Sequence, residues 1–166
     1  MKKIVVVLAS LLVVACASTP KPESQAAEKN TPSVSIAAVS ATETESHKLA
    51  AEIQNLQQQS VFFDLDKSSI KKEYRDALQA QAKFAKAHKN DMVTIEGNCD
   101  ERGSAEYNLA LGERRANTAR KSLELMGVPA SQIKTVSFGL EKPRLTCHEE
   151  KCWKENRRDD FVHKLN

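Results

Sequence analysis

The stretch from residue 96 to residue 116 constrains the fold of this chain more than any other. It begins at the end of a run with β-branched residues, 92–97, and passes through a polar loop containing Gly103 into a helical pattern that starts near Ser104. A strand, a short loop and a helix in direct succession hold the loop beside the first turns of the helix. Loops between rigid elements are where proteins usually display binding groups.

The predicted helix spans residues 105–126, and three of its residues point toward this loop. Asn108, Leu111 and Arg115 fall at i, i+3 and i+7, so they share one face of the helix, beside the loop that holds Asp100. An ionised Asp accepts hydrogen bonds from an ammonium, and the planar guanidinium group of Arg binds a carboxylate through two parallel hydrogen bonds. The pair therefore suits a ligand that carries both groups. Spacing alone equally allows the two side chains to pair with each other or with water.

The same helix has a second periodicity that predicts its buried stripe. Residues at alternating spacings of three and four lie on one side of a helix and pack against the core. The stripe comprises Leu109, Gly112, Ala116, Ala119, Leu123 and Met126. The face with Arg115 lies just to one side of it and is expected to border the core.

The other elements predict one α+β domain over residues 59–166, with the order β-α-β-α-β-β and helices packed on one mixed sheet. Ser69 suits the N-cap of the first helix in this domain. The expected strands cover residues 60–64, 92–97, 133–138 and 161–165, and a short helix is expected within 147–158.

The first residues have the layout of a secretory signal, here assigned to residues 1–15. Lys2 and Lys3 precede an apolar run that is too short to be a convincing membrane span, and small residues follow. The sequence Val-Val-Ala-Cys at 13–16 resembles a bacterial lipobox, which implies cleavage before Cys16 and attachment of lipid to it. Ala17, by the same resemblance, implies sorting to the outer membrane.

Residues 16–58 are interpreted as the lipidated Cys16 followed by a flexible tether. Up to about residue 42 the composition is rich in Ala, Ser, Thr, Pro and charged residues without an aromatic, so it buries too little surface to offset its ordering entropy. Good helix formers at 43–58 predict a short helix there.

Charge and motif content exclude two classes of function. The chain has 25 basic and 22 acidic residues and few aromatics, which argues against a nucleic-acid binder. The central stretch has no His, no pair of metal ligands and no glycine-rich phosphate loop, so we expect neither an enzyme nor a cofactor.

Cys147 and Cys152 are close enough in sequence to form a local disulfide in an oxidising periplasm. A metal site made with His148 is the competing interpretation, although no fourth ligand is evident. Cys99 is expected to be a small packed residue rather than a reactive thiol.

Three segments together resemble the OmpA-like peptidoglycan-binding domain: FFDLDK at 62–67, EGNCDERG at 96–103, and the helix motif N-x-x-L-G-x-x-R-A at 108–116. The resemblance covers about residues 60–166. Gly112 stands where the family often has Ser, and Asp159 and Asp160 stand where relatives tend to have apolar residues. The last strand is therefore expected to start after them.

This resemblance implies non-covalent binding of the peptidoglycan stem peptide through meso-diaminopimelate, which exposes an ammonium and a carboxylate on one carbon. Asp100 would accept the ammonium and Arg115 would hold the carboxylate. Asn108 and Leu111 would line the pocket, and Asp64 would border it. Replacing Asp100 or Arg115 by alanine is then expected to remove binding without loss of the fold.

At the level of the cell, the resemblance implies an outer-membrane lipoprotein whose domain faces the periplasm. It would anchor the membrane to the cell wall and contribute to envelope integrity and cell division. It also implies contact with the periplasmic propeller protein of the Tol system. The alternative is an adaptor whose main role is docking Tol proteins.

Overall fold

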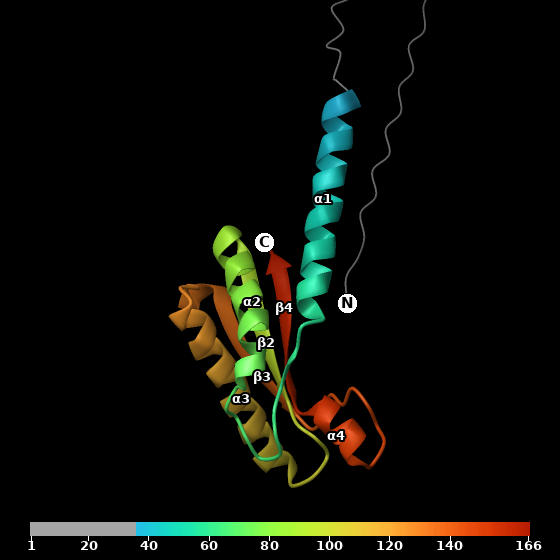
Figure 1. The fold of residues 1–166 in the computed structure, drawn as a ribbon, viewed down its shortest axis with the longest axis vertical. Coiled ribbons are helices and arrows are strands. Elements are labelled where there is room, and N and C mark those ends of the chain that lie inside the picture. Colours follow the sequence, from blue (N-terminus) through green and yellow to red (C-terminus); the bar gives the residue numbers. More distant parts are fainter. Residues whose placement is uncertain (1–35) are drawn as a thin grey trace, which may run out of the picture. The chain divides into compact units, whose positions relative to one another are not determined.

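The computed structural model describes residues 36–166, with side chains from residue 43 onward (Figure 1). The expected signal at 1–15, Cys16 and the first half of the tether lie outside the described residues. Helices are α1 (Ile36–Gln57), α2 (Arg75–Ala87), α3 (Ala105–Leu125) and α4 (Glu150–Asn156), and strands are β1 (Val61–Phe62), β2 (Asp91–Asn98), β3 (Ile133–Gly139) and β4 (Arg158–Leu165). Within this range, no helix combines the length and hydrophobicity that crossing a membrane requires.

The four strands form one mixed sheet in the order β1-β4-β2-β3. β4 runs antiparallel to both β1 and β2, whereas β2 and β3 are parallel and connected through α3. The predicted α+β class and the element order of the domain are confirmed. The loop that leads into α3 follows directly after the end of β2.

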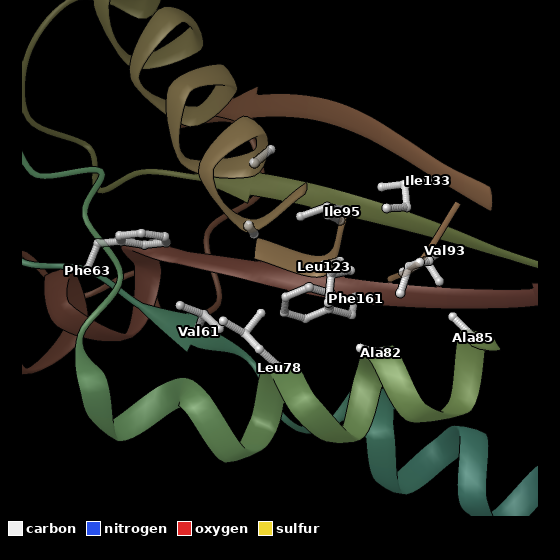
Figure 2. Close-up of a cluster of buried hydrophobic side chains, with 13 residues drawn as sticks. Val61, Phe63, Leu78, Ala82, Ala85, Val93, Ile95, Leu123, Ile133 and Phe161 are labelled. Atoms are coloured by element: carbon white, nitrogen blue, oxygen red, sulfur yellow. The ribbon is translucent and has the colours of Figure 1, made fainter. Parts of the chain in front are cut away.

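The core lies between the sheet and the helices α2 and α3 (Figure 2). Alternate residues of β2, such as Val93 and Ile95, point into this layer, as expected for a strand with one buried face. Ala116, Ala119 and Leu123 of the predicted stripe are fully buried, but Leu109 is 52% exposed. Its place in the stripe was wrong: the end of β3 packs against the backbone of Leu109, whose carbonyl oxygen accepts a hydrogen bond from the Ser137 hydroxyl at 2.7 Å, and the Leu109 side chain remains exposed.

A buried polar network attaches the end of α1 to this core. The Gln81 amide donates to the Leu56 carbonyl oxygen at 2.9 Å, and the Gln81 amide oxygen contacts His163 Nε2 at 2.6 Å. The other ring nitrogen of His163 contacts the Asp91 carboxylate at 2.7 Å. α1, α2, β2 and β4 are thus linked through hydrogen bonds that water does not reach.

Three element boundaries differ from the sequence-based expectation. α1 begins at Ile36, inside the segment expected to be flexible. Ser69 does not cap α2, since a short 3-10 helix at Lys72–Tyr74 precedes it and Tyr74 is the N-cap. β4 begins at Arg158 rather than after Asp160, because backbone pairing with β1 and β2 does not depend on apolar side chains.

Candidate functional site

A small hollow lies where the β2–α3 loop, the start of α3 and the segment after β1 meet. Its volume is about 30 Å³, which is room for little more than a water molecule. Asp100, Asn108, Leu111 and Arg115 all contribute to its wall. Four of the five residues predicted for the ligand site are therefore brought together around one hollow.

The loop that carries Asp100 is held by the first turn of α3. Ser104 caps the helix by accepting a hydrogen bond from the Tyr107 N–H at 3.1 Å. The Asn108 amide donates to the carbonyl oxygens of Arg102 and Ser104 at 2.8 and 3.1 Å. Asn108 thus fixes the loop and uses both of its amide hydrogens to do so.

Asp100 is a buried carboxylate between two arginines. Arg102 donates to it through its backbone N–H, Nε and Nη2, the last at 2.7 Å, and Arg157 Nη1 donates at 3.1 Å. Burial alone would raise the pKa of Asp100, but these hydrogen bonds outweigh it and hold the pKa below its ordinary value. Asp100 is ionised at neutral pH and able to bind a cation.

Arg115 is 0% exposed. Its Nε, Nη1 and Nη2 donate to the carbonyl oxygens of Lys67, Asn98 and Asp64 at 2.9, 2.9 and 3.2 Å. These acceptors are neutral main-chain groups, and burial lowers the pKa of the guanidinium from its usual high value. With Nη1 also donating to Cys99 Sγ at 3.4 Å, one of the five guanidinium N–H groups is left for a ligand.

Cys99 lies in the wall next to both charged residues. Its Sγ donates to the Asn108 carbonyl oxygen at 3.3 Å, and burial raises the pKa of the thiol to about 11. The reactive thiolate form is therefore negligible at neutral pH. Cys99 is a packed residue, as the sequence led us to expect.

The carboxylate of Asp64 does not border the hollow, contrary to expectation. Its side chain is 64% exposed and pairs with Lys71 Nζ at 2.7 Å. This hydrogen bond lowers the pKa of Asp64. Because the chain turns outward after β1, only the backbone carbonyl of Asp64 reaches Arg115.

Sequence reasoning did not find Arg157, which is distant in the chain. Its Nε donates to the Phe63 carbonyl oxygen at 3.0 Å, and Nη2 bonds Glu150 at 2.5 Å while Nη1 bonds Asp100. The adjacent pair Arg157 and Arg158 was visible as a basic cluster, but nothing in the spacing connects it to a loop more than fifty residues earlier.

The segment containing α4 forms a second wall behind Arg102. Cys147 and Cys152 are joined in a disulfide, which leaves neither thiol for the alternative metal site, and no group of metal ligands is present among residues 36–166. Trp153 Nε1 donates to Glu101 at 2.9 Å, and the Arg102 guanidinium lies 4.0 Å from the centre of the Trp153 ring. The disulfide-closed segment thus supports the loop that presents Asp100.

Asp159 is fully buried on the core side of β4, and neither of its carboxylate oxygens has a hydrogen-bond partner within residues 36–166. Burial raises its pKa well above the ordinary 3.8, although the charge of Arg115 acts in the opposite direction. The folded state therefore binds more protons than the unfolded state between these two pKa values, and this residue lowers stability as the pH rises through that window.

We expect Asp159→Asn, which keeps the shape and removes the charge, to raise the free energy of unfolding at pH 7 by about 1–3 kcal/mol. Urea denaturation across pH 4–8 measures this, with a flatter pH profile for the variant than for the wild type. Asp160→Asn is the control, since Asp160 bonds Ser60 and Arg158 and its replacement should destabilise. A less stable Asp159→Asn with an unchanged profile would contradict the expectation.

The fold and the charged hollow define a small α+β binding domain. The sequence profile of the OmpA family matches residues 62–157, and the chain belongs to that family. Among its relatives is the peptidoglycan-associated lipoprotein of Agrobacterium fabrum, 49% identical over 98 residues, which are 59% of this chain and 55% of that protein. The protein of the same name from Pasteurella multocida is 46% identical over 108 residues, 64% of this chain and 72% of that one.

Solved structures agree with this assignment. The peptidoglycan-associated lipoprotein of Burkholderia pseudomallei has a TM-score of 0.62 and 46% identity, covering 63% of this chain and 89% of that one. The C-terminal domain of Helicobacter pylori MotB, at 19% identity and a TM-score of 0.59, shares the fold. The chain spans little more than half the length of several curated relatives. These relatives are named for association with peptidoglycan and not for a catalytic activity, in agreement with the expectation from sequence.

Proposed function

We propose that this protein is an outer-membrane lipoprotein that binds peptidoglycan non-covalently, with its domain facing the periplasm and a lipid on Cys16. One observation carries the proposal: an ionised Asp100 and a cationic Arg115 line the same hollow without pairing with each other. The names of the relatives from Agrobacterium fabrum and Burkholderia pseudomallei support it. In the cell it would hold the membrane to the wall and contribute to envelope integrity and cell division.

The ligand group that matches this arrangement is the side-chain end of meso-diaminopimelate in the stem peptide. Its ammonium binds Asp100, and its carboxylate binds the remaining N–H of Arg115. A lysine-type stem lacks this carboxylate and leaves a buried guanidinium without a counter-charge, which disfavours it by several kcal/mol. Binding of purified domain to walls with diaminopimelate, and not to walls with lysine, tests this specificity.

Entry of the ligand requires Arg102 to move, because a hollow of about 30 Å³ does not hold an amino-acid end. The Arg102 side chain is 33% exposed, whereas the Arg157 side chain is 6% exposed. The ammonium therefore replaces Arg102 on Asp100 and leaves Arg157 in place. Arg102 retains Glu150, 3.7 Å away, and the face of Trp153 as alternative partners.

Asp100→Asn is expected to weaken binding to purified sacculi by about 30-fold or more, since losing one partner of a buried charge pair costs about 2–5 kcal/mol. Co-sedimentation over a range of sacculus concentrations measures it. Glu101→Gln is the matched control, because Glu101 lies in the same loop but bonds His148 and Trp153 outside the hollow. If Asp100→Asn binds as tightly as the control, Asp100 does not contribute to ligand binding.

A second role is docking of the periplasmic propeller protein of the Tol system. Two large apolar side chains at the hollow, Leu65 and Tyr107, are 54% and 44% exposed, and such groups favour a protein surface. Docking there would overlap the stem-peptide site. Competition between a stem peptide and the purified propeller protein tests this, and simultaneous binding of both would exclude the overlap.

A further inference from the structure

The flank of α3 that faces away from the hollow lines a groove. Glu106, Leu109 and Glu113 are spaced by three and four residues, so they lie on one face of the helix, and all three are exposed. With Phe138 and Leu140 from the end of β3 and beyond, they border two adjoining depressions of about 190 and 490 Å³. Leu109, more than half exposed, lines both depressions.

The rim of this groove is acidic. Glu106, Glu113 and Glu141 line it, and none of them is in an ion pair with another residue of the part that the structure describes. Lys142, which follows Glu141 in the chain, lies 4.5 Å from the centre of the Phe138 ring and pairs with Glu96 instead. The groove thus combines an apolar floor with carboxylates that lack cationic partners.

β3 forms one edge of the sheet beside this groove. It pairs with β2 on one side only, and no other strand within residues 36–166 pairs with it. An edge strand leaves every second N–H and C=O group free to pair with an added strand. Side chains of such a strand would alternate, and those on the helix side would lie over Leu109 and Glu113.

We propose that the groove between α3 and β3 is a second binding surface, which takes an extended peptide segment of a partner protein as an added strand. The residues of the segment that face α3 are Lys or Arg, whose apolar stems cover Leu109 and whose charged ends pair with Glu106 and Glu113. The residues between them are apolar and point to the opposite face of the added strand. Main-chain pairing supplies affinity in this mode, and the side-chain pockets supply selectivity. Because the groove and the hollow use opposite flanks of α3, a segment bound here does not cover the hollow.

The test uses two synthetic peptides, one alternating Val with Lys and one alternating Val with Glu, titrated into the purified domain and followed by amide NMR. We expect the Lys peptide to bind at least 10-fold more tightly and to shift the amides of β3 and of residues 105–113. The double variant Glu106→Lys, Glu113→Lys should weaken this binding at least 10-fold. Glu52→Lys, which makes the same charge change on an exposed position of α1, should leave it unchanged.

Three results would overturn the proposal. Equal binding of both peptides would show that the rim carboxylates do not select a basic segment. Shifts confined to the loop at 99–104 would assign the peptide to the hollow instead, and Asp100→Asn would then weaken it. Concentration-dependent dimerisation that is lost in the double variant would identify a second copy of this chain, and not a peptide segment, as the occupant.

Discussion

Arg115→Ala is expected to abolish binding to sacculi and also to lower the free energy of unfolding by about 3–5 kcal/mol. The position of Arg115 at the border of a helix face led to the expectation that its removal would spare the fold. Its complete burial reverses that expectation. Three main-chain carbonyl oxygens would lose their donors, and the space left by the buried side chain would enlarge the hollow.

Two further variants separate the binding role of Arg115 from its structural role. Arg115→Lys keeps the charge but loses the planar fork, so it should recover part of the stability and little of the binding. Arg114→Ala, at the neighbouring exposed position, should change neither quantity appreciably. Urea denaturation and co-sedimentation of the same preparations measure both effects. An Arg115→Ala protein as stable as the wild type would contradict the structural role.

Gly97→Ala is expected to destabilise the fold by about 3 kcal/mol, at the upper end of overpacking effects. A Cβ at this position would lie 2.1 Å from the backbone oxygen of Gly112. Neither backbone can move independently, since one belongs to β2 and the other to α3. The substitution must push α3 away from the sheet, and with it Arg115 away from the carbonyl oxygen of Asn98.

The matched control for this change is Gly127→Ala. Gly127 has φ of 90°, but its nearest atom to an added Cβ is Lys86 Cδ at 3.7 Å. This variant should lose only about 1–2 kcal/mol of stability, which is the strain of an alanine in the left-handed backbone region. Thermal unfolding of the two proteins side by side measures the difference, and a smaller loss for Gly97→Ala would show that β2 and α3 separate easily.

Local periodicity was sufficient to predict β2, α3 and β3, because each has a buried face that repeats with its own period. It failed where tertiary context decides. Leu109 has the spacing of a core residue, but only its backbone contacts the sheet and its side chain is exposed. Ser69 is a good N-cap residue in a segment where the chain enters α2 through a 3-10 turn instead.

The candidate site was only partly predictable for a related reason. Asp100 and Arg115 flank a short loop and the start of one helix, so helix geometry brings them together. Arg157 comes from the end of α4, just before β4, and the carbonyl oxygens of Asp64 and Lys67 come from the segment after β1. The pairing of β1 with β4 brings these segments, which are distant in the chain, together. No spacing within one segment predicts such contacts, nor the burial of Asp159 without a partner.

The shortness of β1 determines how the domain would carry mechanical load. β1 joins β4 through only two residue pairs, and the chain continues from it directly to the carbonyl oxygens that hold Arg115. In a domain held at its hollow, tension entering through α1 would first load the Gln81 hydrogen bond to the Leu56 carbonyl oxygen. It would then load the β1–β4 pairs and the Phe63 N–H bond to the Arg157 carbonyl oxygen. Arg157 also bonds Asp100, so under the proposed function the load from the membrane anchor and the binding of the wall would act on the same arginine.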